Sequence, residues 1–227
     1  FSDNILKLKF GLVQYFDKQR HYGLGVEIYK KLANVPDGNF YDPLTISFAS
    51  LIGKNDYRDY FLSSGWRGFV TTIFFEHFNA ELSFISEWQK SVRPNTVYSF
   101  FSLGNNYRGN PSIQDGKLRS FQLNLRYGSE PVILNLVPVD ALELTVEHTK
   151  PTIFKSDFDF TRYFVSASYN FKTFLQSHLF PPTMRIYLSA GTSTGKLPPQ
   201  KLFTVDTRLS SYAPLGVLKS AGAKQFV

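Results

Sequence analysis

Two Glu-His pairs, Glu76-His77 and Glu147-His148, are the residues in this sequence whose types best suit metal binding. Zinc requires three or four converging ligands, whereas the chain has only 4 His and no Cys. In an extended segment, neighbouring side chains point to opposite faces. Neither pair can therefore chelate an ion by itself, and we predict no metal site.

A second acidic pattern, Asp157 and Asp159, places two carboxylates on one side of an extended segment. Calcium takes six or more oxygen ligands, which this pair does not supply. We therefore interpret the surrounding SDFDF run as a solvated loop anchored by its Phe residues.

Motifs for phosphate binding and for nucleophilic catalysis are absent from the sequence. The GTSTGK run at residues 191–196 lacks the spacing of a phosphate-binding loop, and no helix follows it, so a hairpin loop is the better interpretation. Ser residues are abundant, but nothing in the sequence places a base beside one of them. We predict that the protein is not an enzyme, with no catalytic residues and no cofactor.

Charged residues do recur at the middle of apolar segments, always on one parity of the sequence. Such charges suit a water-filled lumen, where they select solutes or attract a partner, or simply keep the interior polar and pair across strands. The candidate lumen-lining residues are Lys7, Lys9, Glu27, Arg126, Glu143, Glu147, Arg162, Lys172 and Arg185.

The elements that must position these charges are β-strands, and residues 118–127 show the pattern most clearly. Phe121, Leu123, Leu125 and Tyr127 alternate with polar residues, which predicts a strand with one apolar and one polar face. Similar alternation recurs at residues 5–16, 22–30, 44–51, 67–78, 81–89, 142–147, 161–172, 184–191 and, more weakly, 202–209. Asn79-Ala80 is predicted to be a tight turn, and residues 90–116 to be the longest irregular stretch.

The pattern predicts an all-β fold with antiparallel pairing, because no amphipathic helix separates the strands. No linker divides residues 1–227, so we predict one domain, interpreted as a fragment of a longer chain. No apolar run reaches the roughly 18 residues of a transmembrane helix. The charge of +7 is scattered, and no nucleic-acid-binding motif accompanies it, so nucleic acid is not a predicted partner.

Whether the apolar face meets a protein core or lipid decides between a soluble β-sandwich and a membrane barrel. Long strands, apolar faces almost free of charge and an aromatic content of 17% favour an antiparallel transmembrane β-barrel. This segment would supply about ten strands of a larger barrel. The candidate lipid-facing residues are Leu6, Leu8, Phe10, Phe121, Leu123, Leu125, Tyr163, Val165, Ile186 and Leu188.

Four runs also resemble segments of one family: NDYRDYFLSSGW at residues 55–66, NYRGNPSIQDGKLRSFQLNLRY at 106–127, SDFDFTRY at 156–163 and GTSTGKLPPQKLF at 191–203. The family is a Bacteroidetes-type outer-membrane β-barrel domain of unknown function that follows a carboxypeptidase-like regulatory domain. The last run is also similar to a segment of the bacterial surface antigen and outer-membrane assembly-factor superfamily. The Gly-Gly expected after Phe203 is replaced by Thr204-Val205-Asp206.

The resemblance implies a Gram-negative cell outer-membrane location, with lipopolysaccharide and phospholipid as lipid partners. It implies a surface-antigen or assembly-factor-like role, in which the barrel hosts or translocates client proteins or lipids without catalysis. Two alternatives stay open: a passive solute pore with a polar, mildly basic lumen, and a soluble β-sandwich binding module.

Overall fold

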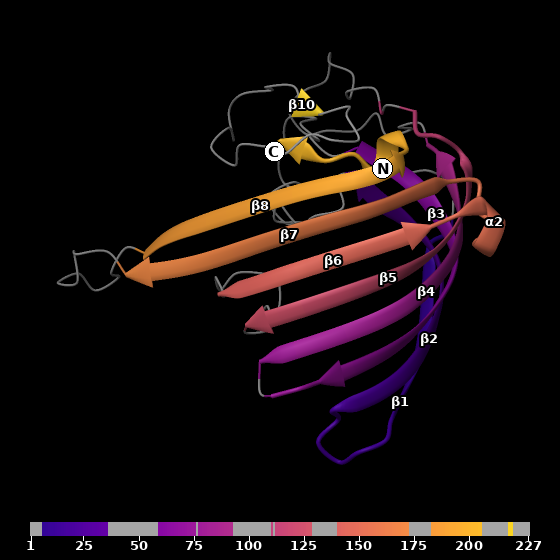
Figure 1. Cartoon of the computed structure of the whole chain (residues 1–227). Helices are drawn as coiled ribbons and strands as arrows, with labels where there is room; N and C mark the ends of the chain where they lie inside the picture. Colours follow the sequence, from indigo (N-terminus) through magenta and orange to yellow (C-terminus); the bar gives the residue numbers. More distant parts are fainter. Residues whose placement is uncertain are drawn as a thin grey trace, which may run out of the picture.

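The computed structural model describes residues 6–35, 59–75, 77–92, 110, 112–128, 140–172, 183–205 and 218–219. Their main body is one antiparallel sheet of 8 strands that follow one another in sequence order. Figure 1 shows these strands side by side as one curved layer. The strands are β1 (Leu8–Tyr15), β2 (Tyr22–Val35), β3 (Asp59–Ile73), β4 (Phe78–Ser91), β5 (Gly116–Gly128), β6 (Ala141–Thr149), β7 (Asp159–Lys172) and β8 (Thr183–Lys196). The prediction of an all-β, antiparallel fold is confirmed.

The strand register sorts the side chains onto two faces, because residues paired across an antiparallel sheet point to the same side. One row of paired residues carries Val13, Gly25, Phe69, Ser83, Gln122, Glu147, Arg162 and Ser193. The adjacent row carries Gln14, Leu24, Val70, Leu82, Leu123, Val146, Tyr163 and Thr192. We name the first side the polar face and the second the apolar face. The alternation predicted from sequence thus continues across all 8 strands.

Glycines on the polar face allow side chains from neighbouring strands to lie across the backbone. A Cβ atom at Gly25 would overlap the Phe69 ring, and one at Gly191 would overlap the Phe203 ring. At Gly65 the obstacle is the backbone itself, since a Cβ would overlap the Ser86 carbonyl oxygen. Glycines at such positions suit a sheet that curves toward its polar face.

Gly65→Ala is expected to lower the free energy of unfolding by about 1–3 kcal/mol, because the backbone of β4 must move to admit one methyl group. Gly68→Ala in the same strand is the matched control, since its nearest neighbour, the Trp66 ring, lies at an ordinary 3.5 Å. Urea unfolding of both variants measures the difference. Equal effects would contradict the proposed close approach of β3 and β4.

The connections between strands alternate between two ends of the sheet. Strands β1, β3, β5 and β7 finish at one end of the sheet, which we name the turn end, and strands β2, β4, β6 and β8 finish at the other, the loop end. The predicted turn at Asn79-Ala80 is wrong, because both residues lie inside β4 and pair with Ile73 and Thr72. The chain reverses four residues before Asn79, at Phe75, which adopts a positive φ of 50°. The apolar parity of Phe78, Ala80 and Leu82 holds Asn79 and Ala80 in the strand.

Three further predictions need correction or fall outside the described residues. The GTSTGK run is not a hairpin loop, because β8 continues through it to Lys196 and pairs with the start of β7. Within the described residues, the weak last strand is present as β9 (Thr204–Val205), which pairs with β10 (Leu218–Lys219) in a separate sheet. The strand predicted at residues 44–51 lies outside the described residues.

The main sheet is open, with β1 and β8 as its two edges. The sequence predicts about ten strands of a larger transmembrane barrel; the described residues form 8 strands of one sheet, and that sheet is not closed. At the loop end a short helix, α2 (Pro151–Phe154), joins β6 to β7 and places the Phe154 ring 5.5 Å from the Phe121 ring. None of the helices among the described residues has the length and apolarity to cross a membrane.

Candidate functional site

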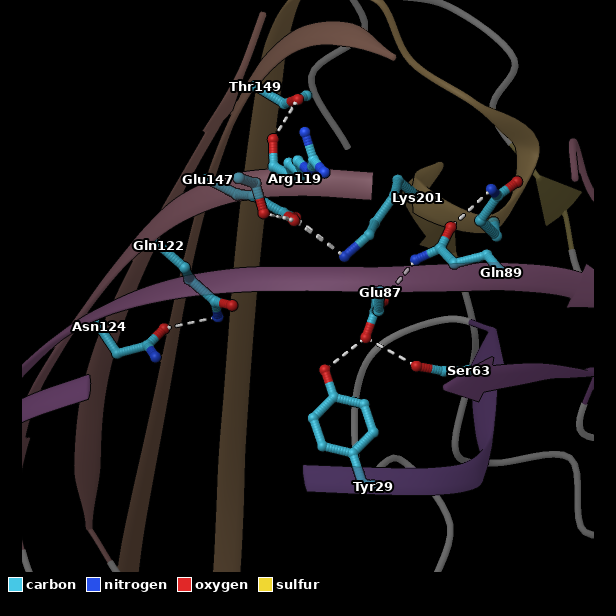
Figure 2. A network of polar contacts seen from close by, with 12 residues as sticks. Tyr29, Ser63, Glu87, Gln89, Arg119, Gln122, Asn124, Glu147, Thr149 and Lys201 are labelled. Atoms are coloured by element: carbon cyan, nitrogen blue, oxygen red, sulfur yellow. Dashed lines mark hydrogen bonds and ion pairs between the residues drawn. The ribbon is translucent and has the colours of Figure 1, made fainter. Parts of the chain in front are cut away.

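The most densely bonded part of the polar face surrounds Glu87 on β4 (Figure 2). Its carboxylate accepts hydrogen bonds from the Tyr29 hydroxyl at 2.5 Å and the Ser63 hydroxyl at 2.6 Å. The Gln89 side-chain amide donates a third, also at 2.6 Å. All four residues are buried, and they come from three adjacent strands. The network therefore ties β2, β3 and β4 together on their polar side.

A turn that follows β8 packs against this same face. It contains the 3-10 helix η2 (Pro199–Lys201), whose Gln200 donates a hydrogen bond to the Gln89 side chain at 2.8 Å. The next residue, Lys201, forms an ion pair with Glu147 on β6 at 2.9 Å, seen in Figure 2. Because one short turn reaches both β4 and β6, the sheet curves around it and the polar face is concave. We name residues 197–203 the inner turn.

The inner turn is anchored at its far end by aromatic contact. The Phe203 ring stacks on the Phe164 ring with centroids 6.2 Å apart, and the Arg162 guanidinium lies 5.1 Å from the Phe203 ring centroid. Gly191 leaves the space that the Phe203 ring fills. Burial of Phe203, Gln200 and Lys201 shows that the inner turn is part of the packed interior, not a solvated loop.

A chain of ion pairs continues the polar face toward β1. Glu27 pairs with Lys9 at 3.0 Å and with Arg67 at 3.3 Å. Arg67 also pairs with Glu81 at 2.8 Å. Positive and negative side chains therefore alternate across β1 to β4, so that each partly buried charge has a partner of opposite sign.

The nine predicted lumen-lining residues all fall on the polar parity, but the structure does not gather them into one site. Lys9 and Glu27 pair with each other, Arg126 pairs with Glu143, and Glu147 pairs with Lys201. Arg162 is buried beside Phe203. The backbone register places Lys172 and Arg185 toward the turn end of β7 and β8, and Lys7 is exposed just before β1.

A cavity of about 290 Å³ lies between the inner turn and strands β1 to β5. Its lining includes four cationic side chains and two carboxylates: Lys9, Lys31, Arg67 and Lys201, with Glu27 and Glu87. The Lys31 ammonium also lies 4.7 Å from the Tyr29 ring centroid. The space on the polar face therefore has a positive balance of formal charge.

Sequence reasoning missed several residues of this face. Glu87 and Gln89 follow the same alternation as Glu81, so the period of two could have placed them with the lumen candidates. Gln200 and Lys201 could not be found in this way, because they lie in a turn without periodicity. Their role depends on contacts with strands more than fifty positions away in sequence, as in the bond between Lys201 and Glu147.

Of the two Glu-His pairs, Glu147 and His148 are separated as their strand positions require, and Glu76 lies outside the described residues. Glu147 is buried on the polar face, whereas the His148 ring lies on the apolar face, 2.7 Å from the Thr161 hydroxyl. Asp157 accepts a hydrogen bond from the Lys117 backbone at 2.6 Å and thereby ties the 150–158 connection to β5. Within the described residues, no group of three or more His, Asp or Glu is close enough to hold an ion.

The apolar face exposes large hydrophobic side chains across most of the sheet. Leu24, Val70 and Leu82 form a central row and are each about half exposed, at 52%, 53% and 50%. Of the predicted lipid-facing residues, Leu123 and Leu125 are half-buried, and the others are exposed on this face: Leu6, Leu8, Phe10, Phe121, Tyr163, Val165, Ile186 and Leu188.

Aromatic residues border this aliphatic centre at both ends. Trp88 is exposed near the loop end, Tyr22, Phe74 and Tyr127 are exposed near the turn end, and Trp66 is exposed at the middle of β3. On β4, Trp88 follows Phe78 by ten positions. At about 3.3 Å per residue, this stretch of strand is about 33 Å long. If the strand were tilted by roughly 40° from the membrane normal, as strands of membrane barrels are, it would span about 25 Å of height, which is the apolar height of such barrels.

Tyr29→Phe is expected to lower the free energy of unfolding by about 1.5–3 kcal/mol, because it removes a donor from the buried Glu87 carboxylate. Tyr127→Phe is the matched control, since Tyr127 is exposed on the apolar face. Urea unfolding measured by tryptophan fluorescence compares the two variants. A loss at Tyr127 as large as that at Tyr29 would show that the Glu87 network is not a specific source of stability.

No protein-family model matches the chain, and a search of curated proteins gives no significant match.

Proposed function

We propose that this chain is the membrane-spanning part of an outer-membrane β-barrel protein that hosts or translocates proteins or lipids without catalysis. One observation carries the proposal: the curved sheet exposes large apolar side chains across most of one face while its concave face buries paired charges. In water, an exposed apolar surface of this extent is costly. Against hydrocarbon it is favourable, and strands with this alternation satisfy their backbone groups within the sheet.

The two unpaired edges of the sheet favour a barrel that pairs with further strands over a passive solute pore. An edge strand presents unpaired N–H and C=O groups to which an incoming strand adds by main-chain hydrogen bonds. Every residue of β1 is exposed, so this edge has the geometry for such pairing. Further strands of the protein, or a strand of a client, would complete the barrel at β1 and β8.

A passive solute pore is the second candidate, and the cavity on the polar face favours it. Lys9, Lys31 and Arg67 give that space a positive balance of formal charge, which would favour the passage of anions over cations. The inner turn argues for a restricted passage, because its Gln200 and Lys201 side chains fill the concave side across β4 to β6.

Detergent dependence and gel migration test the membrane proposal together. The full chain should require detergent for solubility and should migrate differently with and without boiling, as folded membrane barrels do. Single-channel recording in planar bilayers then separates the two roles: a hosting barrel closed by the inner turn should conduct little, whereas a pore should conduct with anion preference. A monodisperse chain in detergent-free buffer would contradict both roles and leave the soluble β-sandwich module.

A further inference from the structure

Basic residues are concentrated where the apolar face meets the loop end. Lys30 on β2, Trp88 on β4 and Lys117 on β5 lie in one row of the register, together with Ser64. On the same face, Lys90 is the next residue after Trp88 on β4, and Arg119 is the next residue after Lys117 on β5. We name Lys30, Lys90, Lys117 and Arg119 the basic rim. Lys30 and Lys90 are exposed, and Lys117 and Arg119 are half-buried.

The half-buried members of the rim are held in place by aromatic and backbone contacts. The Lys117 ammonium lies 5.7 Å from the Trp88 ring centroid, and the Arg119 guanidinium donates to the Phe154 carbonyl at 3.2 Å. Strands about 4.8 Å apart put Lys30 and Lys117 roughly 14 Å from each other across the sheet. That spacing suits more than one phosphate group on a single large headgroup.

Among the residues that the structure describes at this end, no carboxylate forms an ion pair with the rim. Asp115 accepts hydrogen bonds from the Ser91 backbone and hydroxyl, and Asp157 accepts one from the Lys117 backbone. Both carboxylates thus serve the connections between strands. The outward balance of formal charge at the rim is positive, directly beside Trp88, whose residue type is enriched at membrane interfaces.

We propose that the basic rim binds the phosphate groups of a phosphorylated glycolipid in the outer leaflet of the membrane. The inference rests on the proposed membrane-spanning function. The leaflet follows from the lengths of sequence between strands: the two longest follow β2 and β4, which both finish at the loop end, and membrane barrels place short turns in the periplasm and long loops outside. The rim is therefore at the height of the outer headgroups, with its Lys stems along the apolar face.

Binding of purified lipid A to the detergent-solubilised full chain tests the inference, with microscale thermophoresis as the readout. The triple variant Lys30→Gln, Lys117→Gln, Arg119→Gln should bind on the order of a hundredfold more weakly, since each charge near the headgroups contributes roughly fivefold. The control variant Lys18→Gln, Arg20→Gln removes charge at the turn end and should bind as tightly as the unmodified chain. Lys90 is not substituted, so that the apolar face beside it is undisturbed.

Three outcomes would overturn the inference while leaving the membrane proposal intact: unchanged binding by the triple variant, equal weakening by the control variant, or phosphatidylglycerol binding as tightly as lipid A. Inorganic phosphate that competes at the same concentration as lipid A would also overturn it, because the rim would then bind any phosphate. A chain that needs no detergent would instead contradict the proposed function itself.

Discussion

Leu82→Arg is expected to reduce the stability of the membrane-inserted chain by about 2–4 kcal/mol, the cost of an arginine on the lipid face near the bilayer midplane. Leu82 is half exposed in the central row of the apolar face, between Val70 and Leu123. In water the same change would be close to neutral, because the side chain is already exposed. Refolding into lipid vesicles across a urea series measures the cost.

Gln122→Arg is the matched control for Leu82→Arg. Gln122 pairs with Ser83, the neighbour of Leu82, and lies on the polar face beside the cavity. An added arginine there should change stability by less than about 1 kcal/mol, because paired charges already occupy that face. Equal stability of the Leu82→Arg variant and the unmodified chain in vesicles would contradict the lipid-facing assignment.

Lys201→Met is expected to lower the free energy of unfolding by about 3–5 kcal/mol, because Glu147, at 2% exposure, would keep its charge without the ammonium of Lys201. The remaining hydrogen bond from Ser120 to Glu147, at 3.0 Å, does not replace a cation. The inner turn should also loosen from the polar face. Urea unfolding gives the loss of stability, and planar-bilayer recording should show a larger conductance for the variant.

The double variant Glu147→Gln, Lys201→Met separates the ion pair from the rest of the inner turn. Removal of both charges avoids an uncompensated buried carboxylate, so most of the lost stability should return. If the double variant is no more stable than Lys201→Met alone, the effect belongs to the loss of packing by the lysine stem, and the ion pair is not what holds the inner turn.

The period of two in the sequence predicted most of the strands and the faces of their side chains. Phe121, Leu123 and Leu125 share the apolar face with Tyr163 and Val165, as their parity requires. Alternation carries this information because a slip of one residue would exchange the faces of a whole strand. The same signal failed at Asn79-Ala80, where turn-forming residue types lie inside a strand held by its neighbours.

The inner turn could not be predicted, because nothing local marks it. Pro198, Pro199 and Gln200 indicate a break in the strand pattern but not where the chain goes next. Its position depends on Gln89, Glu147 and Gly191, residues from three strands that meet only when the sheet curves. The cavity depends on the same curvature, and of its charged lining the sequence identified Lys9 and Glu27 but not Lys31, Arg67, Glu87 and Lys201.

The direct test of the central claim is the accessibility of single labels on the two faces. The chain has no Cys, so Leu82→Cys, Leu123→Cys, Ser83→Cys and Gln122→Cys each give one spin-label site in lipid vesicles. Electron paramagnetic resonance with lipid-soluble oxygen and a water-soluble nickel complex measures which medium each label meets. We predict strong oxygen access at positions 82 and 123 and little at 83 and 122. Labels at 82 and 123 that meet the nickel complex as readily as an exposed loop site would contradict the assignment of the apolar face to lipid.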